Sequence, residues 1–100
     1  MDNYKVIEEK LKRHEPFRGN TLEAFWDAIS DNYVVFSYRT KIAEYNPAVK
    51  STMFDPSQMS VTTSKHQSII ARAWGFPPVS VLRKNNDPNK FVGPVLRVES

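Results

Sequence analysis

The residues best suited to bind an anion lie together between positions 62 and 66. The run Thr62, Thr63, Ser64, Lys65 and His66 supplies three hydroxyls, a fixed positive charge and an imidazole. Ser64, with Gln67 three residues later, has the form of a capping box, so we expect a helix over 65–74. A helix start offers backbone N–H groups and the positive end of the dipole, which attract phosphate or carboxylate. We therefore predict an anion or nucleic-acid site here, in which Arg72 is included.

A purely structural role for these residues remains open. Ser64 would then only cap the helix, the threonines would fill a strand, and His66 would hydrogen-bond a carbonyl. With an ordinary pKa of about 6.5, His66 could act as a general base or a pH switch. However, no Asp or Glu lies within ten residues of it, which favours the structural role. The absence of a glycine-rich approach also argues against a P-loop nucleotide cradle.

A second candidate is the pair Tyr38 and Arg39, directly after the apolar run YVVFSY. On an exposed sheet face the ring could stack on a base and the guanidinium could grip a phosphate. The competing interpretation places Tyr38 in the core and Arg39 at a solvated edge.

Several classes of chemistry are excluded or disfavoured by residue types. The chain has no cysteine, which excludes disulfides, thiol catalysis and thiolate zinc sites. His14 and His66 are far apart and lack acidic partners at ligand spacing, so we expect no metal. There is also no Ser/His/Asp spacing or nucleophile elbow. We expect a protein without a cofactor that is not an enzyme, although a small enzyme or ligand binder using Ser64 and His66 stays as an alternative.

The charge of the chain is unevenly distributed. Residues 1–20 carry five Lys/Arg against four Asp/Glu, residues 21–58 three against five, and residues 59–100 six against two. The C-terminal part could therefore face a polyanion, while the middle could not do so easily. No segment has the roughly 20 apolar residues of a membrane span, and the N-terminus lacks the apolar run of a signal peptide. We expect a cytoplasmic protein.

The sequence pattern predicts an α+β fold, whose helices and strands would position these residues. We expect one domain over 1–100, with a small, mainly antiparallel sheet packed by helices at about 4–13 and 65–74. In the first helix Tyr4, Ile7 and Leu11 share one face, and Asp2 or Asn3 can cap its start. Gly75 and the two prolines that follow it end the second.

The clearest strand is 33–38, whose face of Val34, Phe36 and Tyr38 we expect to lie on the core. After an irregularity at 39–41, residues 42–43 should continue it. Residues 20–31 are ambiguous, because their apolar spacing favours a helix while Phe25 and Trp26 are good strand residues.

The remaining segments carry weaker signals. We expect a surface loop over 46–58, a short strand over 59–63 and a last strand over 79–83. A turn follows at 85–89, and residues 91–98 either return as an edge strand broken at 93–94 or form part of a loose tail.

Three blocks of the chain contain Phe17, Gly19, Asn20 and Thr21, then Ser37, Tyr38, Thr40, Ile42 and Ala43, then Ser60, Thr62, Thr63, Ser64 and His66. These residues fit the patterns F-x-G-N-[ST], S-Y-x-T-x-I-A and Y-S-x-T-T-S-x-H. In these patterns the chain resembles a family of small, mostly phage-encoded proteins of unknown function. Met59 departs from the pattern, where an aromatic ring is usual. The resemblance implies a bacteriophage source, the host cytoplasm, a mixed fold, and a strand over 21–29 paired with 33–38. It implies no activity.

Taken together, the residues favour a non-enzymatic, phage-encoded protein that contacts nucleic acid or a host protein that handles nucleic acid. The alternative is a protein–protein inhibitor of a host factor that acts through an aromatic surface, because tandem aromatics such as Phe25-Trp26 make good interface anchors.

Overall fold

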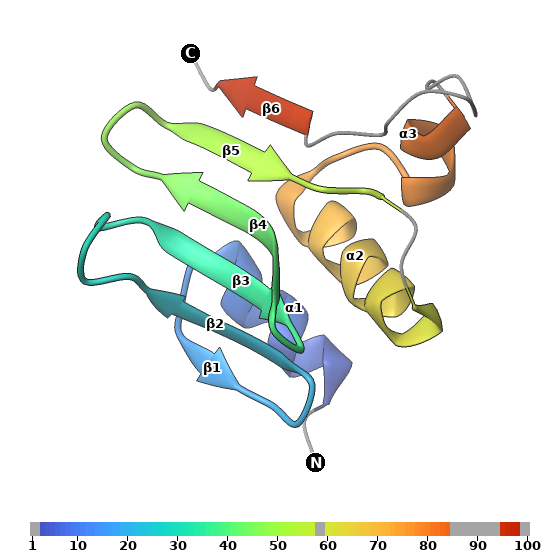
Figure 1. Ribbon diagram of the computed structural model, residues 1–100, viewed down its shortest axis with the longest axis horizontal. Coiled ribbons are helices and arrows are strands. Elements are labelled where there is room, and N and C mark those ends of the chain that lie inside the picture. The colour runs from blue at the N-terminus through green and yellow to red at the C-terminus, as the bar shows by residue number, and fades with distance from the viewer. Residues whose placement is uncertain (1–2, 58–59, 85–94, 99–100) are drawn as a thin grey trace.

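The computed structural model of the protein describes residues 3–57, 60–84 and 95–98. In chain order the elements are α1 (Tyr4–Lys12), β1 (Phe17–Arg18), β2 (Leu22–Trp26), β3 (Tyr33–Ser37), β4 (Thr40–Asn46), β5 (Ser51–Phe54), α2 (Val61–Trp74), α3 (Val79–Lys84) and β6 (Val95–Val98). The strands form one sheet in sequence order, and each is antiparallel to the next. Helices α1 and α2 pack against each other on one face of the sheet (Figure 1). The predicted α+β fold is confirmed.

Helix α1 forms where the sequence predicts it. The Asn3 side chain caps the start by accepting a hydrogen bond from the Lys5 backbone N–H at 2.9 Å. Ile7 and Leu11 lie one turn apart and are both buried. The helix starts at the predicted residue and ends one residue before the predicted end.

Helix α2 begins earlier than predicted, and residues 61–63 of the expected strand over 59–63 lie in this helix. Met59 lies outside the described residues. Ser60, not Ser64, is the N-cap, and its hydroxyl accepts a hydrogen bond from the Thr63 backbone N–H at 3.1 Å. The β-branched residues that suggested a strand lie in the first turn of the helix instead. The end is as expected, because Gly75 adopts a left-handed φ of 74° that a residue without a Cβ reaches easily.

The ambiguous segment 20–31 contains strand β2, as the family resemblance implied. All five residues of β2 pair with β3, so Leu22 and Ala24 alternate into the core. The helical spacing is misleading here, since pairing along a full strand outweighs an intrinsic preference over so few residues.

The face of β3 that packs under the helices is opposite to the predicted one. Tyr33, Val35 and Ser37 point into the core, while Phe36 stacks on Phe25 on the other face. Hydrogen bonding explains the reversal. The Tyr33 hydroxyl donates to the Glu15 carbonyl at 2.7 Å, and the Ser37 hydroxyl has partners on α2, so both polar groups can be buried.

Residues 42–43 do not continue β3, contrary to the prediction. The chain turns at Tyr38, whose φ is 57°, and returns as β4. In this hairpin Val35 pairs with Ala43 but Phe36 pairs with Lys41, which leaves Ile42 as the extra residue of a bulge. Ile42 and Ala43 are consequently both buried, although they are consecutive.

Two further predictions are corrected, and one of the two alternatives for the C-terminal segment is found over residues 95–98. The expected loop over 46–58 contains β5, and the expected strand over 79–83 is the short helix α3. The Pro78 carbonyl accepts hydrogen bonds from the backbone N–H groups of Val81 and Leu82, as expected of a proline at a helix start. Residues 95–98 form the edge strand β6, which pairs with β5. Residues 85–94, on which the turn and the broken part of that strand were predicted, lie outside the described residues.

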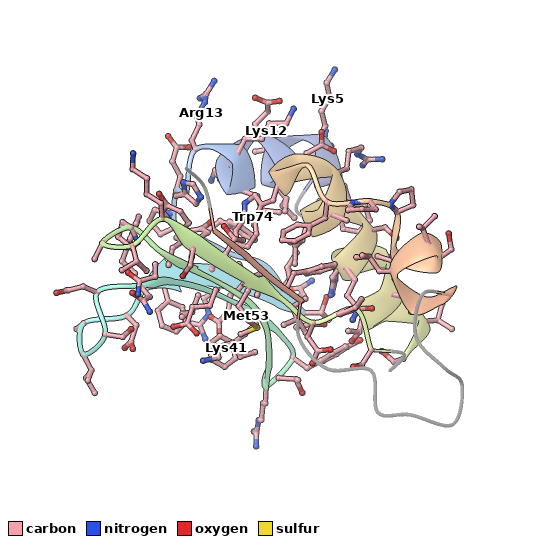
Figure 2. The ribbon with its side chains drawn as sticks, turned by 90° about the horizontal axis from the view of Figure 1, so that it is seen from above. Lys5, Lys12, Arg13, Lys41, Met53 and Trp74 are labelled. Carbon is pink, nitrogen blue, oxygen red and sulfur yellow. The ribbon has the colours of Figure 1, made fainter. Side chains whose placement is uncertain are left out.

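The core lies between the helices and the sheet, and Trp74 joins the two. Its ring, 8% exposed, packs near Tyr33, and its indole N–H donates to the Leu11 carbonyl at 2.9 Å. Figure 2 views the sheet nearly edge-on, with Trp74 on the side that carries the helices. This packing holds the C-terminal end of α2 in place. Because α2 is one continuous helix, its N-terminal end is positioned as well.

Candidate binding site

A chain of hydroxyls around one imidazole joins the three segments that carry the family resemblance. The Ser37 hydroxyl lies 2.8 Å from Nδ1 of His66 and 2.9 Å from the Thr63 hydroxyl. The Thr21 hydroxyl lies 3.3 Å from Nε2 of His66. Ser60 extends the chain by donating to the Thr63 hydroxyl at 3.0 Å. The network thus fixes the start of α2 against the end of β3 and the β1–β2 turn.

His66 is sealed inside this network. Its side chain is 1% exposed, and both ring nitrogens have hydroxyl partners. Burial lowers the pKa of His66, because the charged imidazolium loses hydration. A neutral ring with one donor and one acceptor nitrogen suits these hydroxyl partners. The arrangement therefore favours a positioning role for His66, through hydroxyls rather than through the carbonyl that the sequence suggested.

Directly outside the network lies a cleft of about 260 Å³ between two turns. One wall comes from the β1–β2 turn with its flanking residues 18–23, and the other from Tyr38 and Arg39. The Tyr38 backbone N–H donates to the Thr21 carbonyl at 2.7 Å, which ties the walls together. Thr21 also contacts His66, so the cleft and the buried network share a residue. The positive φ of Tyr38 belongs to the two-residue hairpin turn between β3 and β4, and Asp31 and Lys50 show the same feature in the neighbouring hairpins.

The cleft combines two guanidinium groups with an accessible aromatic ring. The Arg18 side chain is 88% exposed and lies 3.8 Å from a Glu23 carboxylate oxygen, a loose pair in water. Arg39 is exposed, and the ion pairs between described residues do not include it. The Tyr38 side chain is 52% exposed. Planar guanidinium groups match phosphate oxygens, and an exposed ring can stack on a base.

The predicted residues of the α2 start separate into different environments. Thr63 and His66 point inward, Thr62 and Ser64 are half-buried, and Lys65 is exposed. The backbone N–H groups of Thr63 and Ser64 already bond the Ser60 hydroxyl and carbonyl. The structure therefore spreads these residues over an interior network and a surface, and their anion-binding role remains a prediction.

Arg72 lies away from the cleft of Tyr38 and Arg39. Its guanidinium bonds the Glu8 carboxylate on α1, and this hydrogen bond is the main cause that lowers the pKa of Glu8. Arg72 and Ser64 line a separate cleft of about 530 Å³ beside α3, whose other walls include Phe76 and Val79. Arg72 and Ser64, both predicted for the anion site, therefore lie beside apolar residues in this second cleft and not beside His66.

Sequence reasoning missed Arg18, Thr21 and Ser37 as site residues. Thr21 and Ser37 lie far from position 66 in the chain, and only strand pairing brings them together. The one available signal was the resemblance, because each of its three blocks contributes a residue to the network. Arg18 carried no signal apart from its place inside the first block.

The described part of the chain has neither a cluster of metal ligands nor a membrane-spanning helix. Over residues 3–57, 60–84 and 95–98, His, Asp and Glu side chains do not gather in groups of three that could hold a metal ion. Among these residues the helices are all too short or too polar to cross a membrane.

Comparison with known proteins identifies the family. Residues 3–76 match the model of DUF8033, a family of unknown function, and the chain belongs to that family. The match includes the network and the cleft. Neither a curated protein nor a solved structure matches the chain.

Proposed function

We propose that this member of DUF8033 is a non-enzymatic binding protein that contacts nucleic acid through the cleft between the β1–β2 and β3–β4 turns. The observation that carries the proposal is the convergence of Arg18, Arg39 and the exposed Tyr38 ring around one cleft. Charge and stacking are the two interactions by which proteins hold nucleic acid without reading a sequence. A phage-encoded protein in the host cytoplasm, as the resemblance implies, would meet such a partner.

The buried network supports the proposal by giving the cleft a fixed shape. Arginine side chains hold a phosphate well only when the backbone that carries them is held in place. Here the Thr21 carbonyl clamps Tyr38 from one side, and the contact of the Thr21 hydroxyl with His66 anchors that turn to α2. His66 acts in this account as a positioning residue. Lys65 precedes His66 in α2 and is exposed.

The test is fluorescence anisotropy with labelled single-stranded DNA and RNA of about 12 nucleotides, a length that one small domain can cover. Binding should weaken between about 50 and about 200 mM salt, because phosphate contacts release counterions. The double variant Arg18→Ala, Arg39→Ala should flatten the log–log salt slope by about 1.4, which is 0.7 for each lost contact with a single strand. Binding that does not depend on salt would contradict the proposal.

Two controls separate the cleft from general positive charge. Arg13→Ala removes an exposed cation on the helical side, which Figure 2 labels above α1, and should leave the affinity unchanged. Tyr38→Ala should lose about 1–3 kcal/mol of binding if a base stacks on the ring, while Tyr38→Phe should retain it. Equal losses for Arg13 and Arg39 would point to nonspecific attraction rather than a site.

The alternative of an inhibitor that acts through Phe25 and Trp26 together is less well supported. Both rings are partly exposed, at 38% and 43%, but they serve different faces of the sheet. Phe25 stacks on Phe36, whereas Trp26 packs near Tyr33 and donates to the His14 carbonyl. The tandem pair therefore does not form one continuous anchor. A host protein as partner remains the outcome to consider if oligonucleotides do not bind.

A further inference from the structure

The face of the sheet opposite the helices carries a partly exposed apolar centre. By the alternation of the strands, this face carries the side chains of Glu23, Phe25, Val34, Phe36, Lys41, Glu44 and Met53. Val34 is buried at 4% exposure, and the other six are half-buried or exposed. Figure 2 shows Lys41 and Met53 on the side of the sheet away from Trp74 and the helices. Among the described helices, α1 and α2 both pack on the other face. We refer to these seven residues as the open face.

The centre of the open face is apolar and includes two stacked rings. The rings of Phe25 and Phe36 stack with centroids 5.7 Å apart and planes 6° from parallel. Phe25 retains 38% exposure, and Phe36 and Met53 are half-buried. Aromatic residues and methionine are enriched at the centre of protein interfaces.

The charges of the open face oppose a polyanion as its partner. Glu23 and Glu44 balance Lys41 and the neighbouring Arg18, and Asp27 at the β2–β3 turn adds a further carboxylate. Each carboxylate would repel phosphate. The open face adjoins the cleft at Glu23, which also lines the cleft beside Arg18. An apolar centre with both signs of charge around it fits a protein partner.

The register of the strands makes this surface complementary to itself. Phe36 and Lys41 lie in one row across the sheet, and Val34 and Glu44 lie in the next row. A second copy can be related to the first by a two-fold axis that lies above the open face, perpendicular to the strands and midway between the two rows. Rotation about this axis places each row of one copy over the other row of its partner. It places Lys41 of one copy opposite Glu44 of the other, and Phe36 over the position of the buried Val34. Sheets that pack face to face lie about 10 Å apart, a distance that such side chains span.

We infer that the open face is the interface of a two-fold dimer between copies of this chain. The apolar centre provides the burial, and the two Lys41–Glu44 contacts between copies fix the relative orientation. Within one copy Lys41 and Glu44 already lie 3.0 Å apart, so in the dimer each carboxylate lies between two ammonium groups. The inference does not depend on nucleic-acid binding. Because Arg18 borders both surfaces, association is measured without nucleic acid.

Sedimentation velocity over a wide concentration range provides the test. The wild type should show a concentration-dependent monomer–dimer equilibrium. Phe25→Ser should weaken it by at least about tenfold, because Phe25 is at the apolar centre. The matched control Tyr4→Ser changes a ring of similar exposure, 47%, on α1 and should leave the equilibrium unchanged. A wild-type protein that sediments as a monomer up to its solubility limit would overturn the inference.

Charge exchange tests the orientation. Lys41→Glu alone places like charges opposite each other at both contacts, as does Glu44→Lys alone, so each variant should associate at least about tenfold more weakly. An equimolar mixture of the two variants restores opposite charges at both contacts and should recover dimers. A mixture that associates no better than its components would overturn the two-fold arrangement. Circular dichroism of each variant checks that the fold is retained.

Discussion

Truncation of His66 to alanine should destabilise the protein strongly, because the ring is buried and its neighbours depend on it. With 1% exposure, nearly the whole imidazole becomes a cavity, and cavities of this kind cost about 2–3 kcal/mol in well-packed interiors. The Thr21 and Ser37 hydroxyls each lose a partner, which adds about 1–2 kcal/mol since Ser37 keeps Thr63. We expect a loss of about 3–5 kcal/mol in the free energy of unfolding, or at least roughly 12 °C in Tm.

The assay is urea unfolding followed by tryptophan fluorescence near neutral pH. The neighbouring variant Lys65→Ala removes an exposed side chain from the same helix and should stay within about 0.5 kcal/mol of the wild type. A double-mutant cycle with Ser37→Ala should show a coupling of about 0.5–3 kcal/mol between Ser37 and His66. A loss below about 1 kcal/mol for His66→Ala, or additive effects in the cycle, would refute the reasoning that the network joins α2 to β3.

Three further predictions concern stability. Because burial lowers the pKa of His66 in the folded protein below the unfolded value of about 6.5, the unfolded chain binds more protons, so the free energy of unfolding should fall as pH decreases through about 6.5. In His66→Gln this part of the pH profile, measured by urea unfolding, should be absent. Trp74→Phe loses the hydrogen bond to the Leu11 carbonyl and should cost about 1–3 kcal/mol; an unchanged urea midpoint would contradict that bond. Gly75→Ala should cost about 1–2 kcal/mol because φ is 74°, and an unaltered melting temperature would argue against a left-handed helix end.

The elements that were predictable are those whose local signals agree. In α1 the apolar spacing of Ile7 and Leu11 coincides with a capping Asn3 and the Glu8–Lys12 pair at 3.5 Å, so one answer satisfies every signal. For α2 two serines compete as the N-cap. The choice of Ser60 over Ser64 depends on tertiary packing, since the earlier start places Thr63 and His66 beneath β3.

The face of β3 was not predictable from hydrophobicity alone. Val34, Phe36 and Tyr38 form the more apolar side, but Tyr33 and Ser37 find buried partners that the local sequence cannot reveal. The same limit applies to the site. Tyr38 and Arg39 could be recognised from residue type, whereas Arg18 reaches them only through the pairing of β1 with β2 and β2 with β3.

Nuclear magnetic resonance offers the most direct test of the claim that the cleft binds nucleic acid. Uniformly ¹⁵N-labelled protein is titrated with an unlabelled single-stranded oligonucleotide, and the shift of each backbone amide is followed. The account predicts that the largest changes occur in the β1–β2 turn around Asn20 and at Tyr38 and Arg39, which line the cleft. Saturating changes confined to α1 or to the cleft beside α3, with the amides of those two turns unmoved, would contradict it.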